Sequence, residues 1–286
     1  DDGIPHAQES RGLGDVYKRQ DLYITADAGR LGAFDAKGMF QNSMTPIIEA
    51  TVPSNFRSDN WTGIAKRARI IYYSPDRVSL SDLSGMTYED LANSKWKGKI
   101  VIRKSNNIYN QSLVASLIKN IGEEATEKWA KKLVGNFARK PQGNDRSQII
   151  AVANGEADLA VANSYYIGIM LSGSAGQEQL EAAKKVKMIF PNQENRGAHI
   201  NISGAGILKN APNEDNANSF IEFLISKRVQ KYMIDKSYEY SVLNDVAPSS
   251  EIAVFGTDFK EDQTSVRSFG ELNPDAVKLM DRSGWK

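Results

Sequence analysis

Two adjacent tyrosines, Tyr165 and Tyr166, stand where a predicted strand (159–162) passes directly into a predicted helix. Neighbouring residues on a helix point about 100° apart, so two adjacent side chains can aim at one point only at such a terminus. Tyr109 is placed similarly, in the first turn of a predicted helix (108–120) after the polar loop 105–107. Taken singly, each position is more typical of a packing tyrosine. The three together indicate a shared site.

Three converging phenols would favour one kind of ligand. A free phenol has a pKa near 10, so a tyrosinate at neutral pH requires a strong cation beside it. Hard, highly charged metals prefer oxygen ligands. Ferric iron fits this requirement better than magnesium or calcium, which take carboxylates and carbonyls. The residues therefore predict a ferric-iron site if the three side chains meet.

The composition excludes most other chemistry. The chain has 286 residues, no cysteine and two histidines, which excludes disulfides, thiolate zinc sites, iron–sulfur clusters and histidine clusters. No phosphate-loop pattern or Gly-x-Ser-x-Gly elbow is present, so we expect no enzyme. The net charge of +1 gives no reason to expect nucleic acid. No apolar run approaches the roughly 20 residues of a membrane-spanning helix.

Strands and helices alternate from residue 21 onward, which predicts an α/β architecture. Strands are expected over 22–25, 67–73, 99–103, 159–162, 186–190 and 200–203. Helices are expected over 88–93, 108–120, 123–134, 145–154, 214–225 and 227–235, with a last one from 273. On the strand 67–73, Arg67 and Arg69 share a face. One of them could pair with an anion or a tyrosinate, and a solvated pair on an edge strand is about equally compatible with the spacing.

Two further patterns are interpreted as structural. The run 204–206 (Gly-Ala-Gly) lies inside a strand and does not open a helix, so we expect close packing of two segments there. His199 stands alone beside a strand, and we expect a hydrogen-bonded structural histidine. Residues 1–20 lack periodicity, and the run 11–20 resembles translated adapter sequence. We expect a non-native or disordered segment there, with no signal peptide in it.

From about residue 21 to residue 286 the sequence resembles bacterial periplasmic ferric-iron-binding proteins, most closely the cyanobacterial type. The resemblance rests on these stretches, in the family's order: 25–31 (TADAGRL), 66–69 (KRAR), 105–112 (SNNIYNQS), 141–145 (PQGND), 162–166 (ANSYY), 190–193 (FPNQ), 199–206 (HINISGAG) and 279–285 (LMDRSGW).

The resemblance implies a bilobal α/β periplasmic-binding-protein fold of type II, with mixed-sheet lobes joined by hinge strands. We expect a first lobe of 21–71 and 197–247, incomplete, and a second of 72–196 and 248–286. Tyr109, Tyr165 and Tyr166 match the family's iron ligands. Arg69 matches a cleft arginine that offsets ligand charge, and Asp27 has a minor supporting role beside the metal.

The implied function is capture of Fe³⁺ in the periplasm by a monomer that delivers it to an inner-membrane ABC permease and its ATPase. Two departures stand against the pattern. The family's first strand, with its own ligand, is expected before residue 21. Many relatives also carry an arginine where this chain has Ile169 and Met170. The alternatives are the same fold with a polyamine, an anion or a sugar, and a hydrolase of similar layered fold.

Overall fold

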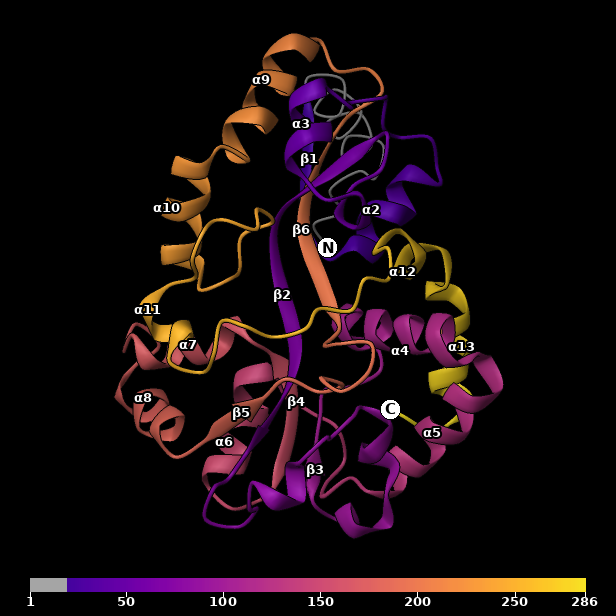
Figure 1. The fold of residues 1–286 in the computed structure, drawn as a ribbon. Helices are drawn as coiled ribbons and strands as arrows, with labels where there is room; N and C mark the ends of the chain where they lie inside the picture. The colour runs from indigo at the N-terminus through magenta and orange to yellow at the C-terminus, as the bar shows by residue number, and fades with distance from the viewer. Residues whose placement is uncertain (1–19) are drawn as a thin grey trace, which may run out of the picture.

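The computed structural model describes residues 20–286, so the prediction for residues 1–20 lies, except for its last residue, outside the described residues. The strands in this part of the chain form a mixed sheet in the order β1-β6-β2-β4-β3, with β5 also on β2. Their bounds are β1 Leu22–Ala26, β2 Trp61–Tyr73, β3 Ile100–Val101, β4 Leu159–Asn163, β5 Lys187–Ile189 and β6 Ile200–Ile207. Strands β2 and β6 run through the middle of the molecule (Figure 1).

Strand β2 changes partner halfway along its length. Its first part, Trp61 to Ala68, pairs antiparallel with β6, and its second part, Arg69 to Tyr73, pairs with β4 and β5. All 13 of its residues are buried. The strand begins six residues before the predicted start at Arg67. Gly63 and Lys66 disturb the apolar pattern there, and the pairing with β6 is a non-local interaction that overrides local propensity.

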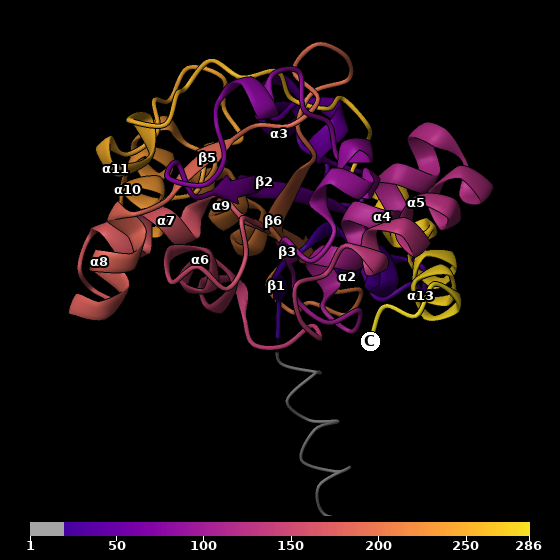
Figure 2. The same ribbon diagram turned by 90° about the horizontal axis from the view of Figure 1, so that it is seen from below.

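The helices flank this sheet on two sides. Seen from below, α7, α8, α10 and α11 lie on one side of β2, and α4, α5 and α13 lie on the other (Figure 2). The helix bounds are α2 Ala28–Asp35, α3 Pro46–Thr51, α4 Ile108–Ile121, α5 Glu123–Gly135, α6 Asp145–Ala153, α7 Tyr165–Leu171, α8 Gln177–Lys184, α9 Glu214–Leu224, α10 Lys227–Ser237, α11 Ser250–Ala253, α12 Arg267–Glu271 and α13 Asn273–Arg282.

The helix predicted over 88–93 is wrong in type. It is a 3₁₀ turn, η3 Glu89–Ala92, which ends after four residues because Asn93 has an extended backbone (φ −70°, ψ 136°). The Tyr88 hydroxyl donates to the carbonyl of Arg69 and accepts from the backbone N–H of His199 at 3.0 Å. None of the helices among residues 20–286 is long and apolar enough to cross a membrane.

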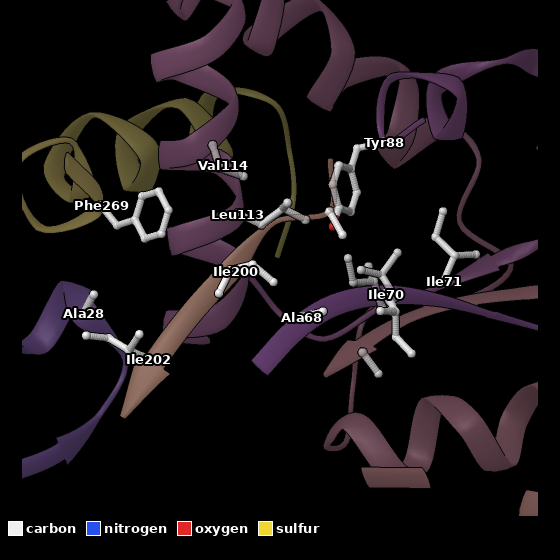
Figure 3. Close-up of a cluster of buried hydrophobic side chains, with 14 of the residues drawn as sticks. Ala28, Ala68, Ile70, Ile71, Tyr88, Leu113, Val114, Ile200, Ile202 and Phe269 are labelled. Carbon is white, nitrogen blue, oxygen red and sulfur yellow. The ribbon is translucent and has the colours of Figure 1, made fainter. Parts of the chain in front are cut away.

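The core continues from one part of the sheet to the other. Figure 3 shows Leu113 and Val114 of α4 and Phe269 of α12 lying over Ile200 of β6. Each of these side chains is almost fully buried. Burial of one such side chain stabilises the fold by about 1.5–3 kcal/mol. The helix that carries Tyr109 is thus anchored on the strands at the middle of the molecule.

The predicted lobe boundaries stay a prediction. The change of partner on β2 falls between Ala68 and Arg69, close to the predicted boundary at residue 71. The segment after residue 248, assigned to the second lobe, also approaches the first. A Cβ built on Gly32 of α2 would lie 3.0 Å from the Cα of Gly270 in α12, so these two backbones nearly touch.

The close packing predicted at 204–206 is confirmed. A Cβ on Gly204 would lie 2.7 Å from the Thr62 carbonyl oxygen of β2 and 2.6 Å from a methyl of Leu31. A Cβ on Gly206 would lie 2.7 Å from the ring of Phe40. These glycines let α2 and the loop after it lie directly on β6.

We predict that Gly204→Ala destabilises the protein by about 1–3 kcal/mol, because the new methyl meets a backbone carbonyl that cannot move without breaking the β2–β6 ladder. Thermal melting should show a fall of roughly 2–4 °C per kcal/mol. Gly135→Ala is the matched control, because a Cβ at Gly135 meets nothing within 4 Å. Equal melting of the two variants would contradict the packing argument.

Candidate metal centre

Tyr165 and Tyr166 are the first two residues of α7, directly after β4. Their ring centroids lie 4.2 Å apart with an interplanar angle of 36°. The turn between strand and helix is held by Tyr72 of β2, whose hydroxyl lies 3.0 Å from the Asn163 carbonyl oxygen and 3.2 Å from that of Ser164. The phenols are therefore placed by a buried strand and not by a free loop.

Tyr109 is the second residue of α4, and two guanidinium groups flank it. The Cζ of Arg67 lies 5.7 Å from the centroid of its ring, and that of Arg103 lies 5.9 Å away. Cations at such distances from an aromatic ring are attracted to it. They also stabilise negative charge on nearby oxygens. The three tyrosines come from two helices that begin at this place.

The pKa values of Tyr165 and Tyr166 depend on burial and on the groups beside them. Burial raises the pKa of Tyr165 far above its ordinary value, and Tyr166 and Tyr109 raise it further, while Arg67 lowers it. Burial also raises the pKa of Tyr166, as do Asp145 and Tyr109, while a hydrogen bond with Tyr165 and the charge of Arg103 lower it. Without a cation, Tyr165 and Tyr166 are neutral at physiological pH. A ligand that binds phenolates must displace their protons.

Other metal donors are not gathered anywhere in the described part of the chain. Among residues 20–286, no group of three histidine, cysteine, aspartate or glutamate side chains could hold a metal ion. The phenol oxygens are therefore the candidate metal donors beside α4 and α7.

Arg69 lies close to this place, but its guanidinium is held in a buried network. Its Nη1 lies 2.7 Å from an Asp145 carboxylate oxygen and 3.0 Å from Asn163 Oδ1. Its Nη2 donates to Asn110 Oδ1 at 2.6 Å. Asn110 follows Tyr109 in the chain, so Arg69 contacts the phenol site through the backbone of α4. Its predicted role in offsetting ligand charge stays a prediction.

Asp27 occupies a second buried network, at the N-cap of α2. Its Oδ1 accepts from the Gly29 N–H at 2.8 Å and from the Ser112 hydroxyl at 2.7 Å. Its Oδ2 accepts from Asn201 Nδ2 at 2.8 Å. Burial raises its pKa, although the charge of Arg67 and the hydrogen bonds from Ser112 and Gly29 lower it. Asp27 thus joins α2, α4 and β6, and any part it has beside a metal stays a prediction.

Sequence reasoning missed Arg103 and Asp145. The Asp145 side chain is fully buried and pairs with Arg69 at 2.7 Å and with Arg103 at 3.0 Å. In the sequence, Asp145 is typical of the first turn of a helix, and Arg103 of the end of a strand. One signal was available: a buried arginine on β2 requires a carboxylate partner. The identity of that partner depends on tertiary contacts.

His199 is buried as expected of a structural residue, but the hydrogen bonds expected of its ring are not found. Within residues 20–286, neither ring nitrogen has a hydrogen-bond partner. The ring packs on Phe269, with centroids 4.8 Å apart. Burial lowers the pKa of His199 to about 3, and nearby arginines contribute to this shift. The side chain is therefore neutral and does not supply a charge.

Comparison with known proteins gives consistent matches over nearly the whole chain. Residues 19–261 match the family model described as bacterial extracellular solute-binding protein. The curated "Iron uptake protein A1" of Synechocystis sp. is 48% identical over 268 residues, which cover 93% of this chain and 73% of that protein. A "Major ferric iron-binding protein" of Neisseria meningitidis is 26% identical over 93% of this chain and 78% of its own length.

Among solved structures, the Trichodesmium protein (IdiA, FutA) in complex with iron and citrate ligands superposes with a TM-score of 0.91. It is 47% identical, and the match covers 96% of this chain and 89% of that one. The ferric binding protein from Campylobacter jejuni is 38% identical with a TM-score of 0.88, over 97% of this chain and 88% of that one.

The Asp145 network can be tested without any ligand. We predict that Asp145→Asn lowers the free energy of unfolding by about 3–5 kcal/mol, because it leaves two guanidinium groups without their buried charge partner. Chemical denaturation of the metal-free protein would measure the loss. Glu124→Gln, which breaks an exposed pair with Lys128, is the control and should leave the midpoint unchanged. A loss no larger than that of the control would show that the pairs are dispensable.

Proposed function

This chain belongs to the family of bacterial extracellular solute-binding proteins, and we propose that it captures ferric iron through tyrosinate ligands and delivers it to an ABC importer. One observation supports the proposal: the Tyr165 and Tyr166 rings lie 4.2 Å apart at the start of α7, and Tyr109, which raises the pKa of both, lies between Arg67 and Arg103. The names of the relatives, iron uptake protein and ferric iron-binding protein, support the same cargo.

The fold expected from the resemblance is confirmed. Structures at 47% and 42% identity superpose on this chain with TM-scores of 0.91, and they share the bilobal α/β periplasmic-binding-protein fold. Family membership also supports a location outside the cytoplasm. We infer that the protein acts there as a monomeric carrier without catalytic activity, and that its partners are a membrane permease and its ATPase.

In the proposed complex, Tyr109, Tyr165 and Tyr166 each supply one phenolate oxygen to the iron. Hard trivalent iron prefers such oxygen donors. Arg67 supports the developing negative charge. Its Nε and Nη2 are buried without a hydrogen-bond partner among residues 20–286, whereas Nη1 donates to Ser203 at 2.7 Å. Two unused donors on one planar group suit a phenolate or a carboxylate that joins the metal.

Arg69 and Asp27 have supporting parts in this proposal. Arg69 holds Asn110 and Asp145, and through Asn110 it fixes the first turn of α4 beside Tyr109. Asp27 fixes the start of α2 against Ser112 of the same helix α4. Both side chains would act on the position of the ligands and not by contact with the metal.

The tyrosines can be tested by removing one donor oxygen at a time. We predict that Tyr109→Phe, Tyr165→Phe and Tyr166→Phe each weaken or shift the visible phenolate-to-iron band. Each change should also lower iron affinity by more than the roughly 10–100-fold that outer-sphere partners cost. The double change at 165 and 166 should abolish the band. Titration with ferric citrate, followed by visible absorbance, would measure these effects.

The control for the tyrosine test is Tyr232→Phe, because Tyr232 lies on α10 with 67% of its surface exposed. Melting of the metal-free variants should stay near that of the parent, since each change keeps the ring. Retention of the colour and the iron by the three site variants would show that these tyrosines are structural.

A second prediction concerns pH. Because burial raises the pKa of Tyr165 and of Tyr166, iron must displace phenolic protons at neutral pH. Each proton released makes affinity fall by up to about tenfold per unit of decreasing pH, so the protons of Tyr165 and Tyr166 together make it fall by up to about a hundredfold. Competition against a chelator of known protonation constants would give the slope. The double Phe variant should lose about two units of that slope, and a flat profile for the parent would exclude tyrosinate ligation.

A further inference from the structure

Three consecutive residues after α10, which we name the Tyr238 corner (238–240), reach three different neighbours. Tyr240 exchanges backbone hydrogen bonds with Lys66 of β2, at 2.8 and 2.7 Å. Glu239 pairs with Arg67 at 3.2 Å. The corner is thus fastened to β2 beside the guanidinium that lies over Tyr109.

Tyr238 faces the other way, onto the helix that carries the tyrosine pair. A Cβ built on Gly168 of α7 would lie 2.6 Å from both Cβ and Cγ of Tyr238. Gly168 is buried, and a residue with a side chain could not sit there while Tyr238 keeps its place. Gly168 lies three residues after Tyr165, so the two share a face of α7 on successive turns. Figure 1 shows α10 above α7, with α11 near both.

The backbone of Tyr238 is in a conformation that side chains disfavour. Its φ of 61° and ψ of 17° are left-handed, at the C-cap of α10. Glycine or asparagine is usual at this point, because a Cβ is crowded there. A tyrosine in this position indicates that a contact of its ring compensates for the strained backbone. That contact is with Gly168.

We propose that Tyr238 is a positioning residue for the phenol site. The start of α7 is held on β2 by the Ser164 N–H, which donates to the Ala68 carbonyl at 2.9 Å. By packing on Gly168, Tyr238 adds a second attachment, between the body of α7 and the segment that is paired with Arg67. This inference rests on the proposed function and adds that α7 cannot leave Arg67 without breaking the Tyr238–Gly168 contact. The bound metal is therefore retained in part by a contact that does not touch it.

Four variants separate this role from a structural one. Tyr238→Gly removes the ring and relieves the left-handed backbone, and Gly168→Ala fills the space that the ring needs. Both single variants should speed iron release by about tenfold. The double variant should release iron no faster than the faster single variant, because all three lose the same contact between Tyr238 and Gly168. Tyr238→Phe keeps the ring atoms that meet Gly168 and should release iron at the parental rate.

The measurement is loss of the visible iron band after addition of excess chelator, with melting of the metal-free proteins beside it. Gly135→Ala and Tyr232→Phe are controls and should match the parent. If Tyr238→Gly melts lower than the parent, Tyr238→Asn, which also tolerates the left-handed backbone, takes its place.

Parental release rates in both single variants would overturn the inference and leave the proposed function standing. Rate effects that multiply in the double variant would also overturn it, because they would come from independent contacts. A parent protein that binds no ferric iron would overturn both proposals.

Discussion

The structure depends on the cost of burying two positive charges on one strand. Arg67 and Arg69 occupy the same face of β2, each 1% exposed. A buried guanidinium without a partner is too costly for a marginally stable fold, so each must meet a carboxylate. Arg69 meets Asp145 at the start of α6, and Arg67 meets Glu239 after α10. The start of α6 and the segment after α10 are therefore held against the middle of β2, beside the tyrosines.

This constraint explains a contrast within the phenol site: the Asp145 side chain is fully paired, whereas Arg67 keeps donors, unpaired within residues 20–286, that a ligand could use. Both carboxylate oxygens of Asp145 are paired, one with Arg69 and one with Arg103, so these side chains cannot rearrange without breaking an ion pair. The Arg67 guanidinium is only partly hydrogen-bonded, because its Nε and Nη2 have no partner in the described chain. An incompletely satisfied buried charge is expensive, and proteins keep it where a ligand completes the set. Arg67 has two such nitrogens, whereas Arg69 and Arg103 each have one, and Arg67 also lies over Tyr109.

The sequence was sufficient where the signal was local. A strand that turns directly into a helix places Tyr165 and Tyr166 at the start of α7, and the polar loop before residue 108 places Tyr109 at the start of α4. It was insufficient where partners are distant. Arg67 and Arg69 are two residues apart, yet their carboxylates lie 172 and 76 positions along the chain. The partners of Tyr88 are distant too, because its hydroxyl bonds to the backbone of Arg69 in β2 and of His199 just before β6.

The charges around the phenols fit a trivalent cation better than a divalent one. When three phenols lose their protons and one trivalent ion takes their place, the total charge of the site does not change. A divalent ion would leave the same donors one unit more negative in a partly buried place, where uncompensated charge is costly. The surrounding pairs are nearly balanced as well: Glu239 offsets Arg67, and Asp145 offsets one of the two arginines that it contacts. Asp27 is a third buried carboxyl group, whose pKa the charge of Arg67 lowers against the effect of burial. Three carboxyl groups therefore face three arginines, and a trivalent ion bound by three phenolates leaves that balance unchanged.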